Sequence, residues 1–129
     1  LVIPGVNDDE ETIRWIAQNV LKNAGEDTPL HFTRYYPAYK FDVPPTPVRA
    51  LERAHEIAKS EGLNFVYIGN IPGHPLENTY CPECGRLLIE RYGFSIVRYK
   101  ITPEKRCPRC GREIPLIGRY IPGRLSAWL

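Results

Sequence analysis

The sequence predicts an α/β protein in which a β-α-β-α-β segment, residues 1–78, precedes a small β module, residues 79–117. Short apolar runs alternate with amphipathic stretches before Thr79, whereas all four cysteines follow it. The charge also changes sign there: residues 1–78 hold 7 Lys and Arg against 11 Asp and Glu, a net of −4, and residues 79–129 hold 10 against 4, a net of +6. We therefore expect a domain boundary near Thr79 and a C-terminal tail over residues 118–129.

The composition of the 129 residues is that of a folded protein. Hydrophobic residues make up 43% and charged residues 25%, which argues against wholesale disorder. No apolar run reaches the roughly 18 residues of a membrane span, and no secretory signal is visible, so we expect a cytoplasmic protein. The sequence contains no methionine, even at position 1. This indicates either an unusual start or a chain cut from a longer protein.

The first strand and the first helix are predicted over residues 1–24. The apolar start, Leu1–Ile3, is stopped by a Pro-Gly pair. Asn7 is the expected N-cap, and Glu10 completes a capping box. Acidic side chains in the first turn are explained by the helix dipole without catalysis. Gly25 is expected to end the helix. The apolar stripe consists of Ile13, Ile16, Ala17, Val20, Leu21 and Ala24.

The second strand, residues 30–36, is predicted from its aromatic and β-branched side chains. A rigid loop follows, and Thr46 is expected to cap the second helix, with Pro47 at its first position. Gly62 ends this helix, and residues 64–68 form the third strand. Strands separated by helices imply parallel pairing. Because two helices cover three parallel strands poorly, we expect this part to be a piece of a larger α/β sheet or barrel.

Two matching motifs, Cys81-Pro-Glu-Cys84-Gly85 and Cys107-Pro-Arg-Cys110-Gly111, form the centre of the second part. Two residues between thiolates let a tight turn direct both sulfurs at one ion, and the following glycine can take a positive φ. Segments 86–91 and 94–101 are expected to form a hairpin between the motifs. This layout predicts a zinc ribbon in which Cys81, Cys84, Cys107 and Cys110 hold Zn²⁺.

Other interpretations of the four cysteines stay open at this point. Two disulfides would need an oxidising compartment, and a thioredoxin-like pair would need no second copy of the motif. Iron in a rubredoxin-like site suits the same four thiolates as zinc. Four thiolates fill a tetrahedral shell, so we expect a structural metal rather than a catalytic one. A module with few large apolar side chains depends on such an ion to fold.

Six stretches carry a resemblance to a known family: Leu1-Val2-Ile3-Pro4-Gly5-Val6-Asn7-Asp8, His31–Lys40, Pro44–Val48, Val66–Asn70, Tyr80–Ile89 and Cys107–Ile114. Over about residues 1–117, the chain resembles the radical S-adenosylmethionine enzymes related to pyruvate formate-lyase activating enzyme, in the AmmeMemoRadiSam branch. The resemblance implies the last strands and helices of a partial TIM-like barrel, followed by the family's small C-terminal cysteine module.

The chain departs from that family at its reactive centre. The family's chemistry needs a Cys-x-x-x-Cys-x-x-Cys loop that holds a [4Fe–4S] cluster and leaves one iron open for S-adenosylmethionine. No such spacing occurs here. The resemblance therefore assigns S-adenosylmethionine and the cluster only to a full-length parent or a partner chain. We expect a metal-binding C-terminal fragment that is inactive alone, and that self-associates or pairs with a missing barrel half.

The three histidines are secondary candidates. His31 opens the second strand beside Arg34–Tyr36, and the resemblance makes this segment a candidate lining of a cofactor or substrate pocket. A hydrogen-bonded histidine at a strand end is the simpler interpretation. We expect His55 to be a core histidine of the second helix and His74 to lie at the surface of a turn-rich linker.

The second part also suggests an alternative function, a freestanding zinc-ribbon interaction module that binds RNA or a protein partner. Basic and aromatic side chains alternate along the predicted hairpin. Against RNA binding, four thiolates around one divalent ion lower the net charge to about +4, and the acidic first part would repel a polyanion. The basic residues are Arg86, Arg91, Arg98, Lys100, Lys105, Arg106, Arg109 and Arg112, and the aromatic ones are Tyr92, Phe94 and Tyr99.

Overall fold

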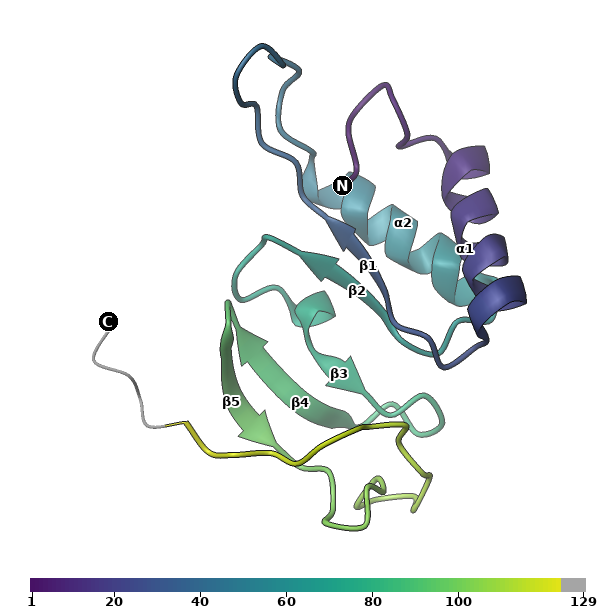
Figure 1. Ribbon diagram of the computed structural model, residues 1–129, viewed down its shortest axis with the longest axis vertical. Coiled ribbons are helices and arrows are strands. Elements are labelled where there is room, and N and C mark those ends of the chain that lie inside the picture. The colour runs from purple at the N-terminus through teal and green to yellow at the C-terminus, as the bar shows by residue number, and fades with distance from the viewer. Residues whose placement is uncertain (124–129) are drawn as a thin grey trace.

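The computed structural model describes residues 1–123, so residues 124–129 of the predicted tail lie outside the described part. Two helices and two small sheets make a mixed α/β structure, as predicted (Figure 1). The elements are α1 (Glu10–Ala24), β1 (Leu30–Thr33), α2 (Val48–Ser60), β2 (Val66–Gly69), the 3-10 helix η1 (Pro75–Glu77), β3 (Thr79–Tyr80), β4 (Leu87–Tyr92) and β5 (Ser95–Tyr99).

A parallel pair of strands, β1 and β2, forms the first sheet, which confirms the predicted parallel pairing. The predicted first strand is wrong as a strand, because it is reduced to a single bridge between Val2 and Arg34. The N–H groups of Val6 and Asn7 both donate to the Ile3 carbonyl, which turns the chain away from the sheet. Two strands and one bridge do not make a barrel, so the barrel stays a prediction.

The first hydrophobic core lies between this pair of strands and the two helices, which lie side by side on one face of it (Figure 1). In the predicted stripe of α1, only Ile13 and Ala17 are buried, while Ala24 at the last turn is exposed. The stripe therefore predicts the correct face of α1 but overstates its buried length. The core consists of Val2, Ile13, Ala17, Phe32, Leu51, Ala54, Ile57, Ala58, Leu63, Val66 and Ile68.

The start of α1 differs from the prediction by two residues. Asp9, rather than Asn7, is the N-cap, and its carboxylate accepts a hydrogen bond from the Thr12 N–H at 2.9 Å. The Asn7 side chain instead accepts from the Ile3 N–H at 2.7 Å and so closes the preceding loop. The predicted end is confirmed, because Gly25 follows the helix with a φ of +94°.

Thr46 is a buried hydrogen-bonding residue rather than the predicted helix cap. Pro47 precedes α2, and no side chain caps this helix. The Thr46 hydroxyl accepts from the Tyr35 N–H at 2.9 Å and donates to the Val2 carbonyl. Its side chain is fully buried. Thr46 therefore joins the N-terminal segment and the chain after β1 to the start of α2.

The second sheet is antiparallel, with the strand order β3-β4-β5. The predicted hairpin is confirmed as β4 and β5, and the short strand β3 is an addition that the sequence did not indicate. The first sheet lies between the helices and this second sheet (Figure 1). Within residues 1–123, no helix is long and apolar enough to cross a membrane.

Replacing Thr46 by valine tests the buried hydrogen bonds. Thr46→Val leaves the Tyr35 N–H without its hydroxyl acceptor and the Val2 carbonyl without its hydroxyl donor. We expect the free energy of unfolding to fall by about 1–3 kcal/mol, measured by urea denaturation followed through the helical circular dichroism signal. Thr46→Ser keeps the hydroxyl and is the matched control. Equal stability of Thr46→Val and the unchanged protein would contradict this role.

Candidate metal centre

The four cysteine sulfurs come together at one end of the second sheet. All four Sγ atoms lie within 4.8 Å of one another, and the pairs Cys81–Cys110 and Cys84–Cys107 are each 3.6 Å apart. Four sulfurs in a tetrahedron around zinc lie about 3.8 Å apart, because each Zn–S bond is about 2.3 Å. A disulfide would bring two sulfurs to about 2.05 Å, and all four cysteines are free thiols. This arrangement can hold one metal ion.

Two turns of matching geometry position the sulfurs. In the first, Cys81 N donates to the Arg86 carbonyl at 2.8 Å, and Gly85 N donates to the Cys81 carbonyl at 2.9 Å. In the second, the corresponding bonds run from Cys107 to Arg112 and from Gly111 to Cys107, again at 2.8 and 2.9 Å. The repeated sequence motif therefore becomes a repeated backbone structure.

The glycine after each cysteine pair is required by the backbone rather than by crowding. Gly85 has a φ of +76° and Gly111 a φ of +77°, as the motif predicts. A Cβ atom at either position would meet no other atom within 4 Å. Any other residue would fit the space but would strain the turn that directs the two sulfurs inward.

The thiols of Cys107 and Cys110 differ in acidity, because each sulfur changes the electrostatic environment of its neighbours. Burial opposes ionisation of Cys107, but N–H groups of Cys110 and Arg109 and the nearby thiols lower its pKa to about 6. The Arg112 N–H favours ionisation of Cys110, yet burial and the three neighbouring sulfurs raise its pKa to about 12. A divalent cation would let all four groups ionise, so metal binding releases protons.

The apolar core around the sulfurs is small. Cys81 and Cys107 are each 2% exposed and belong to this core, whereas Cys84 is half-buried and Cys110 is exposed. The other buried members are Leu88, Ile89, Ile101 and Ile114. Because so few apolar side chains are buried, a metal that joins the two turns would contribute much of the module's folding energy.

No histidine joins the sulfurs among the residues that the structure describes. His74 is half-buried rather than a surface residue: its Nδ1 accepts from the Leu76 N–H at 3.0 Å, and its Nε2 lies 3.0 Å from the Glu52 carboxylate. His55 is half-buried on α2, less buried than the predicted core histidine. Burial, followed by the charge of Lys59, lowers the His55 pKa.

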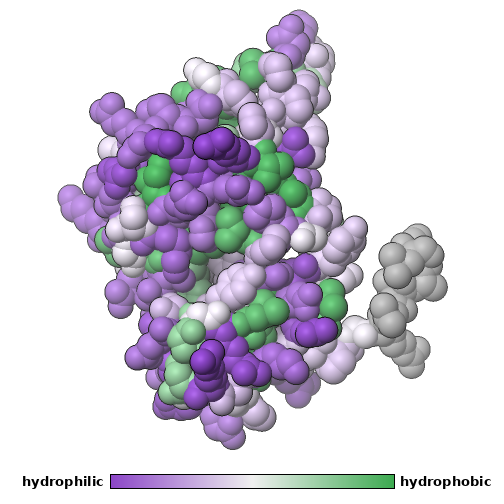
Figure 2. Space-filling view, turned by 180° about the vertical axis from the view of Figure 1, so that it is seen from behind, coloured by the Kyte–Doolittle hydropathy of each residue, from purple (hydrophilic) through white to green (hydrophobic). Residues whose placement is uncertain are grey.

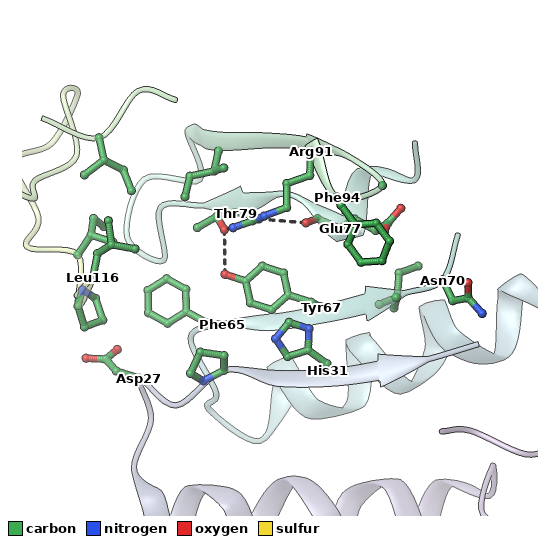
Figure 3. A pocket seen from close by; sticks show the side chains of 18 residues that line it. Asp27, His31, Phe65, Tyr67, Asn70, Glu77, Thr79, Arg91, Phe94 and Leu116 are labelled. Atoms are coloured by element: carbon green, nitrogen blue, oxygen red, sulfur yellow. Dashed lines mark hydrogen bonds between the residues drawn. The ribbon is translucent and has the colours of Figure 1, made fainter. Parts of the chain in front are cut away.

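The segment after β1 serves mostly to hold the following loop. Arg34 Nε donates to the Thr46 carbonyl at 2.8 Å, and the buried Tyr35 hydroxyl donates to the Val43 carbonyl at 3.0 Å. His31, which lies within β1, lines a cleft between the two sheets, and Arg34–Tyr36 do not (Figure 3). The simpler interpretation of His31 is not supported, because its ring stacks on Tyr67 and has no hydrogen bond within the described residues.

Several of the basic residues contact the rest of the chain. Arg112 lies 3.5 Å from Asp27 of the first part, and Arg98 lies 3.3 Å from Glu90 on the neighbouring strand. Arg91 lines the same cleft as His31. Part of the cationic surface that suggested RNA binding is therefore used within the molecule.

The cleft itself was missed by the sequence analysis. It is lined by residues of both sheets and of η1, including Tyr67, Glu77 and Thr79 (Figure 3). The Tyr67 and Thr79 hydroxyl oxygens are 2.9 Å apart, which joins β2 to β3. Only the packing of the second sheet against the first creates this cleft, and no local sequence pattern records that packing.

The comparisons with known proteins give one informative match. An uncharacterized protein of Methanocaldococcus jannaschii is 50% identical over 119 residues, which are 91% of this chain and 36% of the relative. The chain therefore spans about a third of the length of the relative that it matches. No family model matches the chain, and no solved structure does.

Cys81→Ser tests whether the sulfurs hold a metal. We expect about one metal ion per chain by elemental analysis of the unchanged protein, and loss of most of it in the variant, because Cys81 is one of four ligands. Glu83→Ala, an exposed change within the same turn, is the matched control and should keep the metal. Equal metal content in all three proteins, or none in the unchanged one, would contradict the site.

Proposed function

We propose that this chain is the metal-binding C-terminal portion of a radical S-adenosylmethionine protein related to pyruvate formate-lyase activating enzyme, and that it is inactive alone. The four-cysteine cluster supports metal binding, and it supports the lack of activity because it uses every cysteine of the chain and leaves none for a [4Fe–4S] loop. The assignment to the family rests on the sequence resemblance. The match to about a third of a longer relative supports a part within a larger protein. The parallel β1–β2 pair, with both helices on one face, is compatible with the last part of a barrel.

In this proposal the metal is zinc, held by Cys81, Cys84, Cys107 and Cys110. A zinc ion bound by four thiolates has no open position, so it would cross-link the two turns and take no part in a reaction. Iron fits the same four sulfurs. An iron–thiolate site absorbs visible light and a zinc site does not, so the colour of the purified protein distinguishes the two metals.

The place of the second sheet suggests what the module does in a larger protein. In a barrel, the face of β1 and β2 opposite the helices is the inner face. The second sheet lies against this face, joined to it by the Tyr67–Thr79 hydrogen bond and by the Asp27–Arg112 ion pair. We propose that the metal-bound module closes one side of an incomplete barrel.

The first sheet also has open edges. Within residues 1–123, β2 pairs only with β1, and the segment at Val2 pairs only with Arg34. Unpaired strand edges favour pairing with another chain. Apolar patches interrupt the polar surface of the face seen in Figure 2. We propose that a missing barrel half, or a second copy in its absence, covers these edges.

The proposed lack of activity is tested by anaerobic reconstitution with iron and sulfide, followed by S-adenosylmethionine and a reductant. We expect no 5′-deoxyadenosine by chromatography, because four cysteines in two Cys-x-x-Cys turns do not supply the three-cysteine loop that leaves one iron open. A radical S-adenosylmethionine enzyme treated in parallel is the positive control. Formation of 5′-deoxyadenosine by this chain alone would refute the proposal.

The open edges predict self-association. We expect multi-angle light scattering to give a mass above the 14.8 kDa of one chain, increasing with protein concentration, because dilution separates weakly paired edges. The measurement is made on zinc-loaded protein, so that an unfolded second sheet does not cause aggregation. A mass of one chain at every concentration would show that the edges need no partner.

A further inference from the structure

The cleft between the two sheets has the size of a small-molecule site. Its volume is about 470 Å³, and ligand pockets are typically about 300–1,000 Å³ with mainly apolar walls and a few polar groups. Apolar side chains line much of the cleft. His31, Tyr67 and Arg91 lie near its middle, and the polar side chains of Asp27 and Asn70 lie at its two ends (Figure 3). The apolar lining includes Phe65, Ile89, Phe94, Ile101, Ile114 and Leu116.

His31 and Tyr67 form an aromatic surface on the wall of the first sheet. Their rings stack with centroids 4.9 Å apart and planes inclined by 19°. The Tyr67 hydroxyl is hydrogen-bonded to the Thr79 hydroxyl, whereas neither ring nitrogen of His31 has a hydrogen-bond partner within the described residues. Partial desolvation of the ring, followed by the charge of Arg91, lowers the His31 pKa. The neutral imidazole offers one donor and one acceptor.

Arg91 reaches into the cleft from β4 on the opposite wall. Its guanidinium carbon lies 5.6 Å from the centre of the Tyr67 ring, and Nη1 donates to the Thr79 hydroxyl and the Glu77 carbonyl at 2.8 and 3.1 Å. These contacts fix the guanidinium in place. In the part of the chain that the structure describes, Nε and Nη2 donate to nothing and no carboxylate pairs with Arg91.

Glu77 supplies the complementary acceptor. Its Oε1 atom is buried and has no hydrogen-bond partner among residues 1–123. Burial raises the pKa of this carboxyl, against the His74 N–H and the charges of His74 and Arg91. Unpaired buried polar atoms are rare in folded proteins because they lose hydration without compensation. His31 and Arg91 therefore present unused hydrogen-bonding groups to one cleft, and Glu77 lines the same cleft with a carboxyl that becomes an acceptor there when its side chain rotates.

We propose that this cleft binds a planar ring that carries a carbonyl next to an N–H group, as the oxopurine base guanine does. The ring stacks beside His31, its carbonyl accepts from Arg91, and its N–H donates to Glu77. Arg91 and Glu77 carry opposite charges, so a neutral ring suits the cleft better than an anion does. The proposal rests on residues that do not touch the metal and is independent of the proposed function.

Adenine is the matched comparison. It has nearly the same size and stacking face as guanine, but it has no carbonyl and presents an amino group and a ring acceptor at the same edge. With adenine in the same position, the Arg91 guanidinium would face the amino group, which is a donor, and the Glu77 carboxylate would face the ring nitrogen, which is an acceptor. Neither pair can form a hydrogen bond. A site with this arrangement of donor and acceptor therefore binds adenosine more weakly than guanosine, by much more than the small difference in size would cause.

The test is a titration of the zinc-loaded full chain with guanosine and, separately, with adenosine. We expect saturable changes in the NMR signals of His31 and Arg91 with guanosine, and a dissociation constant at least about tenfold weaker for adenosine. No saturable change with guanosine, or equal affinity for both nucleosides, would overturn the proposal.

Two variants test whether guanosine binds in the cleft. His31→Ala removes the stacking ring and should weaken guanosine binding by about tenfold, and Glu77→Gln should weaken it through loss of the charged acceptor. His31 is exposed and makes no hydrogen bond in the described part, so His31→Ala should fold even if Glu77→Gln does not. Arg98→Gln, on the solvent-facing strand β5, is the control and should bind as the unchanged protein does. Unchanged affinity in folded His31→Ala would refute the site.

Discussion

The approach of four sulfurs to within 4.8 Å is the constraint on which the second half of the molecule depends. The buried apolar side chains there, such as Leu88 and Ile101, are too few to hold three short strands together. Two turns with the same hydrogen bonds bring the sulfurs to one point, and a cation at that point would balance charges that otherwise prevent joint ionisation. The positions of β3, β4 and β5 follow from that connection.

The packing of this second sheet against β1 and β2 creates the cleft, which neither sheet could form alone. The Tyr67–Thr79 hydrogen bond and the Asp27–Arg112 ion pair join the two parts at different places. The ion pair is partly exposed and contributes little, whereas the half-buried hydroxyl pair joins β2 directly to β3. The cleft is the space that remains where the two sheets do not touch.

Features that depend on local sequence could be predicted, and features that depend on distant partners could not. The cysteine turns and the positive φ of Gly85 follow from a repeated five-residue motif, and parallel pairing follows from the alternation of strands and helices. Thr46 was misassigned because its hydroxyl bonds Val2, 44 residues away, instead of the start of α2. The N-cap of α1 was misassigned because Asn7 and Asp9 are both good caps, and only the loop at Ile3 decides between them.

None of the four cysteines lines the cleft, but Ile89, Ile101 and Ile114 belong both to the core around the sulfurs and to the cleft lining, so the two sites are connected through the second sheet. Arg91 faces the cleft only while β4 is held in its sheet, and β4 directly follows the first cysteine turn. Loss of the ion would release β4 and so remove one wall of the cleft, while a ligand between the walls would in turn stabilise the metal-bound sheet. Such coupling is necessarily reciprocal. It requires no contact between metal and ligand, because both stabilise the same folded state of the sheet.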